Sequence, residues 1–345
     1  MTPMSAHANQ RDANLDLIRI LSAYLVIVCH TVPYIQLDSL TSPARYSVFF
    51  LQSLSKIAVP LFLMVSGCTL LPKADTLRKT FDRICRMAAV LVLFSLVYAL
   101  LLDQGTASSF GFLSFLESIY RAPVITPYWY LYAYIGILLM LPLLQKLVRA
   151  MSQADFCYYF LLSFLFFGIW PVLVEYTPIS EYTHHFALPL FSTHICYLFM
   201  GYAFSRFSCR MLPVPFLLLV FLFSLMGNAF LMHRDYVSSS AAAYGFMDNI
   251  AFLPMLLASS SFFLLIKRLK LSHRAASIST ALGGCSFGIY LISDLFLIVL
   301  MPVFYAMRSA IGQIQAVLFY HLLVFFASVL SASILRRIPG LNRLL

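Results

Sequence analysis

Residues 15–36 read LDLIRILSAYLVIVCHTVPYIQ, an apolar stretch interrupted by Asp16, Arg19 and His30. A helix needs about 20 mostly apolar residues to cross the hydrocarbon core of a bilayer. Segments of that kind recur along the whole chain, at 15–36, 46–71, 84–103, 128–148, 156–174, 186–205, 213–232, 246–266, 283–304 and 314–335. The pattern predicts an all-α integral membrane protein, a polytopic bundle of about ten transmembrane helices.

The composition favours the same class. Of the 345 residues, 61% are hydrophobic and only 10% are charged, whereas an average soluble domain has about 25% charged residues. A soluble chain this apolar would have too few polar groups to cover its surface. No second, soluble domain is visible. We divide the chain into a cytosolic N-terminal tail at 1–14, a transmembrane domain at 15–335 and a basic cytosolic C-terminal tail at 336–345.

The distribution of Lys and Arg predicts the orientation, because cytoplasmic loops carry the excess of positive charge. With the N-terminus inside and ten spans, 18 of the 23 cations fall on the inner face. The exceptions are Lys56, within the second segment, and Arg45, Arg121, Arg234 and Arg308 in the outer loops. We therefore expect both termini to be cytoplasmic.

The net charge of +10 thus has a topological explanation, and nucleic-acid binding is not expected. The basic stretch 73–86 has two possible roles. It either orients the chain in the membrane and contacts lipid headgroups, or it binds an anionic cytosolic ligand. The seven cysteines show no CxxC or metal-type spacing, so we expect small buried side chains and no metal site.

Arg19 and His30 share one face of the first predicted helix. Eleven residues correspond to three turns plus about 20°, and to about 16 Å along the axis. One face therefore presents a cation near the cytosol and a base toward the outer leaflet. An anionic ligand with a long flexible arm would fit, with phosphates on Arg19 and the reactive end at His30. The alternative is a topology anchor at Arg19 and a hydrogen-bonded interior residue at His30.

Lys56 and Asp294 are two further ionisable residues inside predicted spans, where such groups are costly. They are candidates for a mutual structural ion pair. A proton or ion pathway and a ligand contact are the other possibilities.

Four stretches, in order, resemble the acyltransferase-3 family of bacterial membrane acyltransferases. Arg19 through His30 is similar to its Arg-x10-His signature, and KIAVPLFLMVSG at 56–67 resembles its VPLF segment. YWYLY at 128–132, with Leu141-Pro142-Leu143, and SFGIYLI at 286–292 resemble two more. The resemblance covers nearly the whole chain and is greatest to the compact enzymes that O-acetylate enterobacterial common antigen. Two positions depart from the family pattern, because Ser293 and Pro127 stand where relatives often have His.

The resemblance implies transfer of an acyl group, most often acetyl from acetyl-CoA, to a hydroxyl of a cell-surface or lipid-linked glycan at the bacterial inner membrane. Phosphates of the cytosolic donor would meet Arg19, with Arg83 and Arg86 as further candidates. His30 is the expected catalytic residue, either as the base that deprotonates the acceptor or as a transient acyl carrier. We expect active-site support from the residues Lys56, Ser66, Trp129, Tyr130, Tyr132 and Asp294.

Several points stay open at this level. The loop at 175–185, with Glu175, Glu181 and His184-His185, is either an acceptor contact or an ordinary interfacial loop. The acceptor is an O-antigen, a capsule, common antigen, peptidoglycan or a small molecule. The acyl group is acetyl or succinyl. The sequence does not determine the oligomeric state. Rival functions are a proton-coupled transporter using His30, Lys56 and Asp294, and a scaffold that has lost its chemistry.

Overall fold

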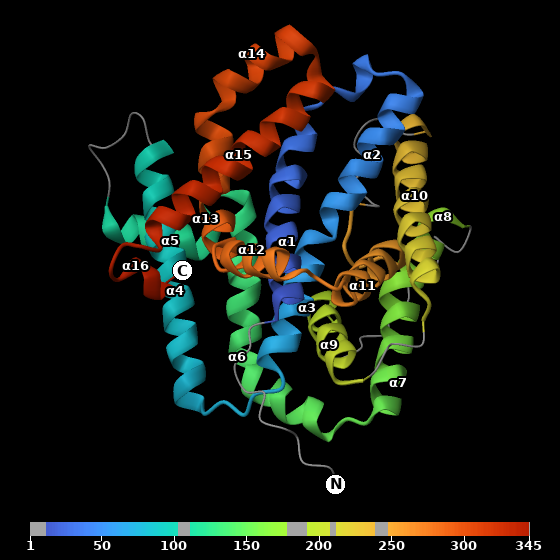
Figure 1. Cartoon of the computed structure of the whole chain (residues 1–345), viewed down its shortest axis with the longest axis vertical. Helices are drawn as coiled ribbons and strands as arrows, with labels where there is room; N and C mark the ends of the chain where they lie inside the picture. Colours follow the sequence, from blue (N-terminus) through green and yellow to red (C-terminus); the bar gives the residue numbers. More distant parts are fainter. Residues whose placement is uncertain (1–11, 103–110, 178–191, 208–211, 239–247, 345) are drawn as a thin grey trace.

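The computed structural model describes residues 12–102, 111–177, 192–207, 212–238 and 248–344. All regular secondary structure in these residues is helical (Figure 1). The helices are α1 (Ala13–Thr31), α2 (Ser42–Lys56), α3 (Ala58–Leu70), α4 (Leu77–Leu102), α5 (Phe112–Arg121), α6 (Trp129–Ala150), α7 (Gln153–Ser163), α8 (Trp170–Tyr176), α9 (Thr193–Arg206), α10 (Val214–Ser238), α11 (Leu253–Lys267), α12 (His273–Gly283), α13 (Ser286–Val299), α14 (Met301–Ile311), α15 (Gln313–Leu335) and α16 (Leu341–Leu344). The expectation of an all-α fold is confirmed.

Within the described residues, seven helical segments are long and apolar enough to cross a membrane, or up to eight if the bent pair α12–α13 is one span. The chain is thus a polytopic membrane protein. The predicted segment 246–266 contains α11, which has 15 residues and falls short of the length required. The predicted segment 186–205 has its first six residues outside the described part of the chain, and its helix α9 has 14 residues. Most of the N-terminal tail also lies outside the described residues. The count of ten stays a prediction.

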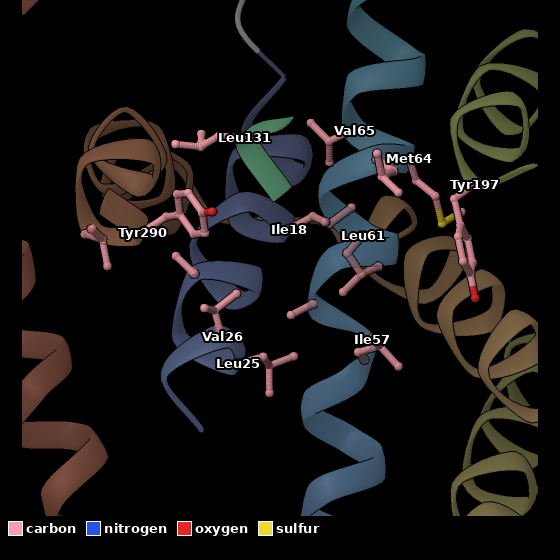
Figure 2. Close-up of a cluster of buried hydrophobic side chains, with 14 of the residues drawn as sticks. Ile18, Leu25, Val26, Ile57, Leu61, Met64, Val65, Leu131, Tyr197 and Tyr290 are labelled. Atoms are coloured by element: carbon pink, nitrogen blue, oxygen red, sulfur yellow. The ribbon is translucent and has the colours of Figure 1, made fainter. Parts of the chain in front are cut away.

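Helix α1 lies near the middle of the bundle, with α2 and α3 on one side and α13 and α15 on the other (Figure 1). Its first turn is capped by the Asp12 carboxylate, which accepts hydrogen bonds from the backbone N–H groups of Asn14 and Leu15. Such a cap satisfies donors that have no partner inside the helix. Figure 2 shows Ile18 of α1 and Leu61 of α3 in the core between these two helices. Both side chains are fully buried.

Two glycines let α3 and α9 cross in contact. A Cβ at Gly67 would lie 1.9 Å from the Leu198 carbonyl oxygen, and a Cβ at Gly201 would lie 1.9 Å from that of Met64. The Cys68 thiol also contacts the Gly201 carbonyl oxygen at 3.0 Å. Only a residue without a side chain permits this approach, which is a common way for membrane helices to pack.

Two helix breaks position polar residues inside the bundle. The first, at Ile57, separates α2 from α3 and leaves Lys56 at the end of α2. The second bends the chain by 61° between α12 and α13, directly before the stretch that carries Tyr290. The predicted segment 283–304 is also not one helix, because α13 ends at Val299 and Pro302 lies in the first turn of α14, where proline is tolerated.

Candidate active site

A cavity of about 310 Å³ lies among α1, α3, α4, α6 and α13, and we call it the arginine cavity. Arg19 lines it from α1, and Arg83 and Arg86 line it from α4. Ser66 and Tyr130, two more residues singled out in the sequence, also lie in its wall. The three arginines predicted to bind an anionic donor thus come from two helices, α1 and α4, and line one cavity.

Each arginine is held by a neighbour. The Arg19 guanidinium lies 2.6 Å from the Asp16 carboxylate, and that of Arg83 pairs with Asp75. Arg86 donates to the Leu344 carbonyl through Nη2 at 3.1 Å. A guanidinium has five N–H donors in a rigid plane, so these contacts orient it and leave donors for an anion.

Asp75, before α4, anchors this arrangement. Its side chain is 1% exposed, and Gln145 of α6 donates to it at 2.9 Å. Lys79 adds an ion pair at 3.0 Å. Burial opposes ionisation, but the hydrogen bonds, above all that from Arg83, hold the pKa of the Asp75 carboxyl below its usual range. The carboxylate therefore stays charged and fixes the start of α4 against α6.

A second cavity of about 540 Å³ contains His30, and we call it the histidine cavity. Lys56 enters its wall from the end of α2, and Trp129 and Tyr130 enter from the first turn of α6. Residues 248–250, ahead of α11, close another side. The predicted base, a cation and two aromatic side chains thus meet in one hollow. Because His30 is eleven residues beyond Arg19 on α1, the two residues are separated by about 16 Å along the helix axis.

Lys56 forms its ion pair with Asp248, not with Asp294. The Lys56 Nζ lies 2.6 Å from Asp248 Oδ2, and the two side chains are only 21% and 26% exposed. The expectation that Lys56 pairs with Asp294 is therefore wrong. Asp294 lies on α13, whereas the segment before α11 turns Asp248 into the histidine cavity.

The two cavities share a wall made of Tyr130 and Tyr290. Their rings meet edge to face, with centroids 5.9 Å apart. The Tyr290 hydroxyl donates to the Pro127 carbonyl at 2.6 Å. Figure 2 shows the Tyr290 side chain extending from α13 to the side of α1. These two tyrosines therefore stand between the arginine end and the histidine end of α1.

Two predicted support residues lie elsewhere. The Tyr132 hydroxyl donates to the Ile119 carbonyl at 2.6 Å, and neither Tyr132 nor Asp294 lines either cavity. Most of the 175–185 loop lies outside the described residues.

The sequence did not predict that Asp248 lines the histidine cavity or that Tyr290 lies between the two cavities. The available signal was a carboxylate two residues inside the predicted 246–266 segment.

Within the described part of the chain, no group of three or more His, Cys, Asp or Glu is placed to hold a metal ion.

A family model described as an acyltransferase domain, that of the acyltransferase-3 family, matches residues 12–337. No curated protein and no solved structure matches the chain. The matched range includes all the residues that line the two cavities.

Proposed function

The chain belongs to the acyltransferase-3 family, and from this premise we propose that it moves an acetyl group from cytosolic acetyl-CoA to a hydroxyl of a cell-surface or lipid-linked glycan. The family makes it a membrane acyltransferase. The donor, the acceptor and the location in a bacterial inner membrane are parts of the proposal.

The observation that carries the proposal is the pair of cavities along α1. The arginine cavity supplies three cations for the phosphates of the donor, and the histidine cavity supplies a base. A donor with phosphates at one end and a thioester at the end of a long flexible arm fits this separation. The arm would pass beside Tyr130 and Tyr290, which line both cavities.

In the proposed reaction, His30 takes the proton of the acceptor hydroxyl as its oxygen attacks the thioester carbonyl. A C–O bond forms, the C–S bond breaks, and the thiolate of coenzyme A leaves and takes up the proton. Lys56 is the proposed donor to the oxyanion of the transition state, because its ammonium lines the same cavity as His30. In the covalent variant, His30 carries the acetyl group between donor and acceptor.

We further propose that both termini and the arginine cavity face the cytosol, in a ten-span topology. Two contacts support a common face. Lys267, at the end of α11, pairs with Asp12 at 2.6 Å, and Arg86 of the arginine cavity binds the Leu344 carbonyl. The start of α1 and the end of the chain thus lie beside segments rich in Lys and Arg, as expected for an inner face.

The test uses the purified full chain in nanodiscs with radiolabelled acetyl-CoA and no acceptor. We expect slow hydrolysis or protein labelling that falls by about 100-fold or more in His30→Ala, the range for loss of a general base. His273→Ala, which removes an exposed histidine at the start of α12, is the control and should keep full activity. Equal activity in wild type and His30→Ala would remove His30 from the mechanism.

The same assay separates the rival functions. A transporter would show no dependence on coenzyme A, and a scaffold would bind the donor without turnover. The pairing of Lys56 with Asp248 also removes the Lys56–Asp294 contact on which the relay through His30, Lys56 and Asp294 depends.

A further inference from the structure

A third, smaller cavity of about 130 Å³ adjoins the histidine cavity. Val32, Pro33, Ile35 and Leu37, from the segment after α1, line one side. Val48, Phe49 and Gln52 of α2 line the other, together with Asp248. Its wall is therefore apolar apart from one amide and one carboxylate. At about 30 Å³ per water molecule, its volume corresponds to about four waters.

Gln52 has an unused acceptor here. The side chain is 8% exposed, and its Nε2 donates to Asp248 Oδ1 at 3.0 Å. Its Oε1 is buried and has no hydrogen-bond partner among the described residues. Buried amide oxygens are nearly always hydrogen-bonded, so one without a protein partner points to a bound donor.

Asp248 connects this cavity to the predicted base. It lines both the small cavity and the histidine cavity. Its Oδ2 accepts from Lys56 and its Oδ1 from Gln52. Each carboxylate oxygen has a second lone pair, so Asp248 has the capacity to accept a further hydroxyl. A group held in the small cavity is therefore next to the space that contains His30.

We propose that Gln52 and Asp248 form the acceptor subsite, which binds a polyhydroxylated ring. One hydroxyl enters the small cavity and donates to Gln52 Oε1, and the ring itself occupies the adjoining histidine cavity, whose volume is about 540 Å³. A neighbouring hydroxyl projects past Asp248 toward His30. The proposal rests on the proposed acyl transfer for its chemistry, but the binding itself does not require turnover.

The experiment measures binding of methyl α-D-glucopyranoside by saturation-transfer NMR on the full chain in nanodiscs. His30→Ala serves as the background so that no turnover intervenes. We expect a saturable signal that Gln52→Leu abolishes. Val48→Phe, which fills the cavity without removing a polar group, should abolish it too. Gln153→Leu, the same substitution at an exposed position at the start of α7, should leave it unchanged.

The outcomes separate this proposal from the proposed function. Hydrolysis of acetyl-CoA by the active chain is measured beside binding as the separate readout of the proposed function, and the exposed control Gln153→Leu should keep its rate within about twofold of the wild type. Two results would contradict the proposed subsite. In one, the chain with Gln52 and Val48 intact does not bind the glycoside; in the other, binding survives both Gln52→Leu and Val48→Phe. Loss of hydrolysis in the wild type with Gln52-dependent binding intact overturns only the acyl transfer.

Discussion

Tyr130 of α6 and Tyr290 of α13 meet edge to face at the wall that the arginine cavity and the histidine cavity share. The Tyr290 hydroxyl is tied to the Pro127 carbonyl, so the ring has little freedom to leave this position. A thioester arm that reaches His30 from the arginine end must pass this pair. Under the proposed function, this contact would align the arm and limit the access of water.

Removal of the Tyr290 ring should join the two cavities. We expect Tyr290→Ala to raise the ratio of acetyl-CoA hydrolysis to transfer by about threefold or more, because water then reaches the thioester. Tyr290→Phe keeps the ring and loses one hydrogen bond, which costs about 1 kcal/mol, so its ratio should stay near that of the wild type. Partition of radiolabel between acetate and acceptor gives the measurement. An unchanged ratio in Tyr290→Ala would show that the ring does not exclude water.

Arg19 should act on donor binding. A hydrogen bond to a charged group is worth about 1.5–3 kcal/mol, so Arg19→Ala should raise the KM for acetyl-CoA by about tenfold or more with a smaller effect on kcat. The control is Arg121→Ala, which removes an exposed arginine paired with Glu117 on α5. If Arg19→Ala lowered kcat alone, the residue would act on the reacting centre instead.

Variants of the Lys56–Asp248 pair should affect the stability of the protein and its transfer activity differently. Lys56→Met and Asp248→Leu should each lower the free energy of unfolding by about 1–2 kcal/mol, because each leaves a poorly solvated charge without its partner. The double variant should recover most of this loss, since no unpaired charge is left. It should nonetheless lack transfer activity, because the ammonium proposed to stabilise the oxyanion is gone. Thermal midpoints in detergent and acetyl transfer are the two readouts, and an active double variant would contradict the role of Lys56.

Asp75 should make a contribution to the stability of the protein that is lost at acidic pH. Its folded-state pKa lies below the ordinary value of 3.8, so its contribution is fully present above that value and is lost as the pH falls through the folded pKa. The difference in thermal midpoint between wild type and Asp75→Asn should therefore be constant near neutral pH and shrink below about pH 4. Asp82→Asn, at an exposed position on α4, is the control. A difference that is the same down to about pH 2 would exclude a charged Asp75 as the source.

A methyl group added where α3 and α9 cross should destabilise the protein. Gly201→Ala places a Cβ 1.9 Å from the Met64 carbonyl oxygen, and relief of such overpacking typically costs about 1–3 kcal/mol. Gly227→Ala, in α10, meets nothing within 4 Å and should stabilise the helix by about 0.5–1 kcal/mol. Opposite shifts of the thermal midpoint are thus expected for one chemical change. Equal shifts would contradict the close approach.

The spacing of Arg19 and His30 on one helix follows from the sequence, because α-helical geometry is regular over eleven residues. The apolar segments likewise predicted where helix lies, since hydropathy along the chain is a local property, and each of the ten expected spans overlaps a helix in the described residues. Local patterns do not reveal the exact helix breaks. The break at Ile57 follows from Pro60, which removes the backbone bond to the Lys56 carbonyl, but the presence of a proline does not fix where a helix ends.

The sequence by itself determined the class of protein, the helical segments and the candidate base on α1, because these depend on composition and on the period of one helix. Only the tertiary structure decided that Arg83 and Arg86 join Arg19, that Lys56 pairs with Asp248, and that two tyrosines divide the cavities. The partner of a buried charge is the group that packing brings within a few ångströms. Asp248 and Lys56 are 192 positions apart in the chain, and no local pattern encodes that contact.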